Sequence, residues 1–167
     1  RAYAHFMLVT LFAKMYDEET ASADPGIPYV TEPETVALKT YQRRTVRYVY
    51  DMIERDLTNG LALIDDEVYD VPSYHFTKAA AHAFAVRYYL FKKEYDNVID
   101  HANQVFPDND FASRLKPWNP VWNPDLSQGS GLNFDEVEML YTKATEKSNI
   151  LLCETASRWA RTYTGFK

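Results

Sequence analysis

Residues 24–33, Asp-Pro-Gly-Ile-Pro-Tyr-Val-Thr-Glu-Pro, constrain the fold of this chain more than any other segment. Asp-Pro-Gly predicts a sharp turn, because Pro25 presets its own φ and Gly26 is free to adopt a positive φ. Pro28 and Pro33 then push the residues before them into extended conformations. The sequence therefore predicts a stiff, non-helical connector that leaves one helix and leads into another.

Amphipathic helical patterns stand on both sides of this connector. Before it, one apolar stripe recurs at helical spacing, formed by Ala2, Phe6, Val9 and Ala13. After it, Thr45 can cap a second helix whose apolar residues keep the 3.6-residue period, namely Val46, Val49, Tyr50, Ile53, Leu57, Leu61 and Ile64. The basic cluster Arg43, Arg44 and Arg47 predicts a solvated helix start or, alternatively, a contact surface.

A second pair of helices is predicted within residues 77–106. Thr77 offers the cap, and the first stripe alternates small residues with rings so that a neighbouring helix can approach closely: Ala80, Ala81, Phe84, Ala85 and Tyr88. The connection at 92–94 is short, and the next helix repeats the period with Tyr95, Val98, Ile99, Ala102 and Phe106 before Pro107 ends it. This pattern predicts an antiparallel helical hairpin.

The order of these blocks resembles the SusD/RagB family of outer-membrane nutrient-binding lipoproteins of Bacteroidetes. The likeness covers residues 1–106, with Gly60, Val86 and Val98 standing where the family's small Ala is expected. The resemblance implies an all-α fold of tetratricopeptide-like helical hairpins with long irregular loops, incomplete because family chains are much longer. We expect residues 1–167 to be a single SusD-like helical domain, a fragment covering the N-terminal helical-repeat part.

Helical periodicity disappears in residues 107–131, which predicts a long loop. The loop contains a tandem Trp-Asn-Pro. Flat rings can cover the C–H face of a sugar, and planar amides can make paired hydrogen bonds with its hydroxyls, so we expect glycan contacts from Trp118, Asn119, Trp122 and Asn123. The alternative is that the tryptophans anchor the loop on the helical core. Four further aromatic residues are weaker candidates, for which packing is the simpler interpretation: Tyr29, Tyr74, Trp159 and Tyr163.

The resemblance implies capture of an oligosaccharide or polysaccharide at the cell surface for delivery to a TonB-dependent SusC-type outer-membrane transporter. It also implies a lipid anchor on an N-terminal cysteine, which cannot be Cys153, since that residue lies deep in the chain and its apolar surroundings predict burial. Two alternatives remain open. One is RagB-type peptide uptake, which the acidic charge and 13 tyrosines would suit; the other is a helical-repeat scaffold for a protein partner.

Charge and motif content argue against several other classes. With 18 Lys and Arg against 24 Asp and Glu, the chain lacks the basic excess that nucleic-acid binding requires. Its longest apolar run, residues 6–13, is well short of the ~20 residues that span a bilayer. The four histidines show no metal-ligand spacing; they are His5, His75, His82 and His101. No phosphate loop or nucleophile elbow is present, so we expect neither enzyme activity nor a cofactor nor a metal.

Overall fold

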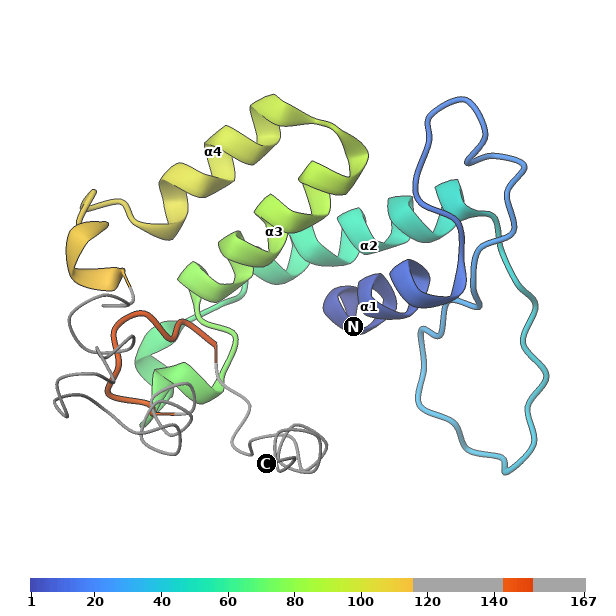
Figure 1. The fold of residues 1–167 in the computed structure, drawn as a ribbon. Coiled ribbons are helices and arrows are strands. Elements are labelled where there is room, and N and C mark those ends of the chain that lie inside the picture. The colour runs from blue at the N-terminus through green and yellow to red at the C-terminus, as the bar shows by residue number, and fades with distance from the viewer. Residues whose placement is uncertain (116–142, 152–167) are drawn as a thin grey trace, which may run out of the picture. The chain divides into compact units, whose positions relative to one another are not determined.

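The computed structural model describes residues 1–115 and 143–151 (Figure 1). Four α-helices lie in this part of the chain: α1 (Ala2–Phe12), α2 (Val46–Leu61), α3 (Lys78–Lys92) and α4 (Tyr95–Val105). Three short 3-10 helices accompany them: η1 (Asp66–Val68), η2 (Pro72–Tyr74) and η3 (Ala112–Arg114). Within the described residues there is no strand, only an isolated antiparallel bridge between Pro25 and Thr45. The predicted all-α class is confirmed.

The chain divides into two compact units, Arg1–Ile64 with Ala81–Val105 and Asp65–Ala80 with Phe106–Lys167. The first unit contains α1, α2, α4 and most of α3. The described part of the second unit contains the 3-10 helices and residues 143–151. Ser73 Oγ there donates to the Ala144 carbonyl oxygen at 3.4 Å, and Asn149 Nδ2 donates to that of Lys143 at 3.0 Å.

Helix α2 begins where the sequence predicts it. Thr45 Oγ1 accepts a hydrogen bond from the Tyr48 backbone N–H at 3.2 Å, which satisfies one of the free donors of the first turn. The buried side chains of this helix follow the predicted stripe: Val46, Val49, Tyr50, Ile53 and Leu57. Fully burying an aliphatic side chain of this size contributes roughly 1.5 to 3 kcal/mol, so this face is the main apolar support of the first unit.

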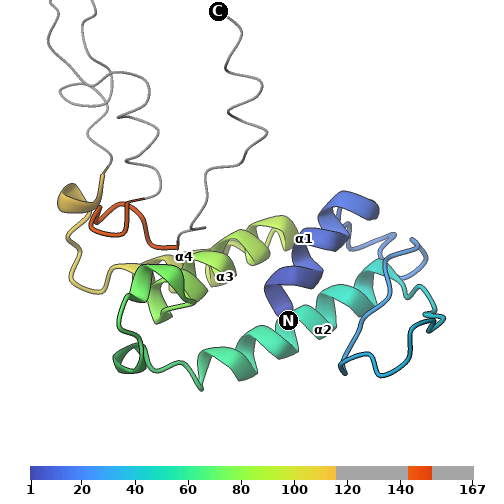
Figure 2. The same ribbon diagram turned by 90° about the horizontal axis from the view of Figure 1, so that it is seen from below.

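An aromatic cluster joins the first three helices. Helix α1 lies across α2 (Figures 1 and 2), and Phe6 on α1 is only 1% exposed. The ring of Phe6 meets Tyr50 of α2 and Phe84, Tyr88 and Phe91 of α3, with centroids 5.2–6.3 Å apart and planes inclined by 67–79°. These are edge-to-face contacts, the arrangement that the ring quadrupoles favour. Phe6 is therefore the centre of the core.

Helices α3 and α4 run in opposite directions, as predicted for a hairpin (Figure 1). The predicted apolar contact stripe of α4 is wrong in two places, because Tyr95 is 60% and Ile99 58% exposed. The contact face instead includes the buried Val105 and the half-buried His101, whose ring nitrogen bonds to His82 on α3. A stripe assigned from apolar residues alone could not include this histidine.

The whole stretch between α1 and α2, residues 13–45, contains no helix and is the connector; the sequence predicts this for residues 24–33. Its middle meets its end: the Gly26 N–H donates to the Arg44 carbonyl oxygen at 2.7 Å, and the Arg44 N–H donates to that of Ile27 at 3.2 Å. Gly26 does not use the left-handed region of φ that is open to a glycine. Glycine is needed there for a different reason, since a Cβ would lie 2.9 Å from both the carbonyl carbon and oxygen of Thr45.

Candidate functional site

The predicted glycan contacts lie outside the described residues. The same holds for the two C-terminal aromatic candidates and the cysteine; the full set is Trp118, Asn119, Trp122, Asn123, Trp159, Tyr163 and Cys153. Of the predicted loop 107–131, the structure describes residues 107–115. The described residues therefore have to be searched for binding surfaces of their own.

Tyr29, one of the weaker candidates, has an internal role. Its hydroxyl donates to Asp56 Oδ2 at 2.6 Å and lies 3.1 Å from the Met52 carbonyl oxygen. Its ring stacks on His5, with centroids 3.9 Å apart. These contacts join the connector to α1 and α2, so Tyr29 is a structural residue.

Asp56 on α2 is the centre of this polar network, with a side chain only 7% exposed. Arg1 donates to it through both Nε and Nη2, and Nη1 of the same guanidinium donates to the Thr31 carbonyl oxygen at 2.9 Å. The hydrogen bonds from Arg1 lower the pKa of Asp56, although burial acts to raise it. His5 completes the network: Nε2 accepts from the Val30 N–H at 3.0 Å, so the ring proton lies on Nδ1, 3.0 Å from the Arg1 carbonyl oxygen.

The sequence predicts a solvated helix start for Arg43, Arg44 and Arg47, but two of these residues hold the connector in place. Arg43 Nε donates to the Gly26 carbonyl oxygen at 2.7 Å. Arg47 Nη2 donates to both the carbonyl and the carboxylate oxygen of Glu18, each at 2.7 Å. The cluster is therefore part of the scaffold, which its position before an amphipathic helix did not indicate.

The turn between α3 and α4 is anchored to α2 by a nearly buried lysine. The Lys92 side chain is 10% exposed, and Nζ lies 2.7 Å from Glu54 Oε2 and 2.6 Å from Glu94 Oε1. Burial acts to lower the pKa of Lys92, but its hydrogen bonds to the two carboxylates outweigh burial and raise the pKa. Glu94 also accepts from Asn97 Nδ2 at 2.8 Å, and Lys93 leaves the helix with φ 62°. The turn is thus held from inside.

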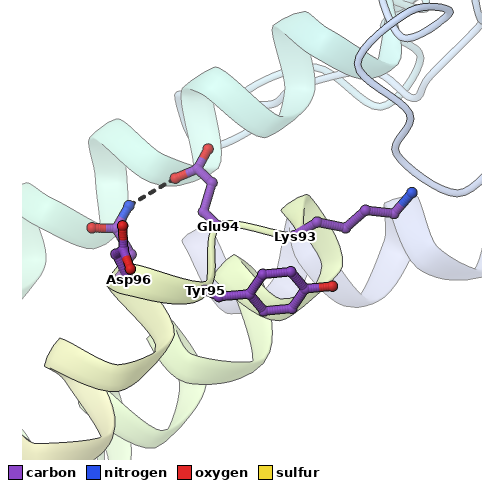
Figure 3. Close-up of a pocket in the computed structure, with 5 residues that line it drawn as sticks. Lys93, Glu94, Tyr95 and Asp96 are labelled. Atoms are coloured by element: carbon purple, nitrogen blue, oxygen red, sulfur yellow. Dashed lines mark hydrogen bonds between the residues drawn. The ribbon is translucent and has the colours of Figure 1, made fainter.

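The outer side of this turn forms an open hollow of about 370 Å³ (Figure 3). Its lining is five consecutive residues: Lys93, Glu94, Tyr95, Asp96 and Asn97. The Tyr95 side chain points away from that of Glu94 in Figure 3 and is 60% exposed. A free ring beside a carboxylate, an amide and an ammonium group can cover the apolar face of a sugar and hydrogen-bond its hydroxyls.

A second hollow, of about 390 Å³, lies where the connector meets α2 and is lined by Pro25, Arg43, Arg44, Thr45 and Tyr48. It also offers a tyrosine ring. The Arg44 guanidinium, however, lies 4.5 Å from the centroid of the Tyr48 ring, in a cation–π contact. Since one face of that ring is already covered, the turn at Tyr95 is the better candidate for stacking a ligand.

In the part of the chain that the structure describes, no three or more His, Cys, Asp or Glu side chains are grouped so that they could hold a metal ion. Glu54 accepts hydrogen bonds from the Tyr88 and Tyr89 hydroxyls as well as from Lys92. None of the helices in the described part combines the length and apolar character needed to cross a bilayer.

Comparison with known families agrees with this geometry. Residues 1–90, which include α1, the connector, α2 and most of α3, match the SusD-like family described as starch-binding and associating with the outer membrane. The chain belongs to the SusD-like family. This confirms the resemblance that the order of the sequence blocks indicates. No curated protein matches the sequence.

Solved SusD superfamily structures contain the same fold. One from Bacteroides thetaiotaomicron VPI-5482 has 26% identity and a TM-score of 0.56, over 70% of this chain and 24% of that one. One from Bacteroides fragilis has 27% identity and a TM-score of 0.54, over 63% of this chain and 24% of its own. A SusD-like carbohydrate binding protein from Bacteroides vulgatus ATCC 8482, at 13% identity, matches in fold alone, with a TM-score of 0.61 over 90% and 28%. The chain thus spans about a quarter of these relatives.

Proposed function

We propose that this protein binds a nutrient glycan at the outer surface of the cell and delivers it to a TonB-dependent SusC-type transporter. The observation that carries the proposal is the match of residues 1–90 to a starch-binding family associated with the outer membrane. The function is binding without bond breaking. A weak complex, with a Kd between mM and μM or ~4 to 8 kcal/mol, would permit release to the transporter.

The proposal extends to the organisation of the chain. Residues 1–167 would act as one SusD-like helical domain in which residues 107–131 form a ligand-facing loop. Attachment to the outer membrane would use a lipid anchor. Fractionation of cells that express the full-length protein, with and without surface protease, tests both the attachment and its side of the membrane.

We assign the glycan contacts to two places. The first is the tandem Trp-Asn-Pro, with stacking by Trp118 and Trp122 and hydrogen bonds from Asn119 and Asn123. The second is Tyr95 at the α3–α4 turn, which is supported by its exposed ring and polar neighbours. By analogy with stacking of bases on aromatic rings, each stacked ring contributes ~1 to 3 kcal/mol.

Isothermal titration of the full-length protein against a panel that begins with starch oligosaccharides tests the proposal. We expect measurable heat with at least one glycan, and a loss of about tenfold or more in affinity for the double variant Trp118→Ala, Trp122→Ala. Tyr48→Ala is the matched control, because that ring is covered by Arg44, and it should bind like the parent. No heat with any glycan would overturn the proposal.

The cargo and the partner need separate measurements. A peptide array probed with the same sample distinguishes RagB-type uptake: strong peptide binding without glycan binding would replace the glycan by a peptide. Co-purification from membranes tests the transporter. We expect a TonB-dependent receptor to be retained by the full-length protein, and an absence of any such receptor would contradict the delivery step.

A further inference from the structure

The hollow at the α3–α4 turn and the hollow at the start of α2 are similar in volume but differ in charge. The first combines one lysine with the carboxylates of Glu94 and Asp96. The second is lined by the guanidinium groups of Arg43 and Arg44 and by no acid. Residues 37–50, from which most of its lining comes, contain four basic residues and no Asp or Glu. In a chain with a net charge of −6, the second hollow is therefore a local concentration of positive charge.

Arg44 is the guanidinium of this hollow that the fold leaves unused. Among the described residues it has no hydrogen-bond or carboxylate partner, and it contacts only the face of Tyr48, 4.5 Å from the ring centroid. Its neighbours are both engaged, Arg43 by carbonyl oxygens and Arg47 by the carboxylate of Glu18. Arg44 thus keeps its charge and its N–H donors for a group from outside the fold.

Stacking on Tyr48 prepares the Arg44 guanidinium for a carboxylate. A guanidinium over an aromatic face keeps its N–H groups in its own plane, where two of them can bind both oxygens of one carboxylate. The Thr45 hydroxyl, which also lines the hollow, accepts from the Tyr48 N–H and keeps its own proton for a further acceptor. The backbone N–H groups of residues 46–48 are already bonded, so the donors of this hollow are side chains.

We propose that this hollow binds the carboxylate of an acidic sugar, a uronic acid, through Arg44. The inference rests on the proposed function for the saccharide and adds a class of sugar to it. Arg43, bonded only to neutral carbonyl oxygens, adds positive charge, and the exposed Pro25 offers an apolar surface to the sugar ring. A glycan with few carboxylates fits better than a dense polyanion, because the chain as a whole is acidic. Neutral glycans have no group for Arg44 and do not use this contact.

Saturation-transfer difference NMR of the full-length protein with sodium glucuronate and sodium galacturonate tests the proposal, with glucose and galactose as the neutral counterparts. We expect at least one uronate to bind, and Arg44→Gln to weaken that binding about tenfold, a difference of ~1.4 kcal/mol. Arg44→Lys keeps the charge but loses the paired N–H groups, so it should show part of this loss. Added NaCl should weaken uronate binding, because it screens an exposed charge pair.

Arg55→Gln is the matched control, because Arg55 is another exposed arginine of α2 and lines neither hollow. It should bind the uronate like the parent. Arg44 is exposed, so its variants should fold, which circular dichroism checks.

The proposal is overturned if neither uronate binds, or if the folded Arg44→Gln variant binds the uronate like the parent. It is also overturned if a peptide with a free C-terminal carboxylate binds through Arg44 and the uronates do not. Binding of neutral glycans is measured separately, so a failure with the uronates alone would leave the proposed function standing.

Discussion

The connector between α1 and α2 and the turn between α3 and α4 both link two helices, but they are held in place in different ways. The connector is long, and its polar side chains bond inward to the helices and to its own backbone, as Tyr29 and Arg43 do. The turn is short, and it is held from behind by Lys92 while Tyr95 stays exposed. The difference separates scaffold from surface: side chains whose hydrogen bonds are already satisfied hold the fold, and those left free can meet a ligand.

The largest expected effect on stability tests the close approach of Gly26 to the backbone of Thr45. Gly26→Ala should lower the free energy of unfolding by about 2 to 3 kcal/mol, because the new Cβ must push apart two backbone segments. Urea denaturation followed by circular dichroism measures the loss.

Gly60→Ala is the matched glycine control. A Cβ on Gly60 meets nothing within 4 Å, and the residue lies in helix α2, so alanine should raise the free energy of unfolding by about 0.5 to 1 kcal/mol. Equal effects of the two substitutions would mean that the connector does not press against the start of α2.

The next effect tests the polar network at Asp56. Asp56→Asn should lower the free energy of unfolding by about 1 to 2 kcal/mol. This is the low end for hydrogen bonds to charged groups, because Arg1 is partly exposed to solvent. Since the folded pKa of Asp56 lies below its ordinary value of 3.8, the parent keeps this stability above that pH and loses it as the pH falls through the lowered pKa. The variant should lack that loss, whereas Asp51→Asn on the exposed side of α2 should behave like the parent.

A smaller effect is expected from the hydrogen-bonded pair of His82 and His101. Both folded pKa values lie below the ordinary 6.5, so the unfolded chain takes up more protons and stability decreases as the pH falls below 6.5. Asp100 opposes this for His101 and reduces the slope. Thermal melts at several pH values should show a shallower decrease for His82→Gln than for the parent; an unchanged slope would contradict the lowered pKa of His82.

The smallest effect on folding belongs to the turn. Tyr95→Ala removes a mostly exposed ring and should change the free energy of unfolding by less than about 0.5 kcal/mol. Its effect on glycan affinity should be about tenfold, by titration against any glycan that binds the parent. A large loss of stability would instead show that Tyr95 belongs to the scaffold, and the contrast between the two connections would disappear.

The helices of the first unit could be predicted because local chemistry determines them. Thr45 caps α2, the stripe from Val46 to Leu57 is buried, and the short link at 92–94 produces the hairpin. The family resemblance was equally accessible, because it depends on the order of these blocks, and the family match confirms it.

Long-range contacts could not be predicted in the same way. The pairing of His82 with His101 joins positions 19 residues apart, and nothing in either helical pattern distinguishes these histidines from surface residues. Likewise, Gly26 reads as a turn glycine until Thr45 is seen against it. The predicted contacts at Trp118 and Trp122 remain a prediction, because no described residue tests them.

The closed base of the connector has a practical consequence. Backbone hydrogen bonds join residues 26–27 to residue 44 and so close the loop between them, in which residues 33–40 are all exposed. The entropic cost of closing a loop grows only slowly with its length, at about 0.6 kcal/mol per doubling. A foreign peptide inserted into residues 33–40 should therefore lower the free energy of unfolding only slightly. An epitope or fluorophore tag placed there would report on the protein in living cells while leaving the helical framework undisturbed.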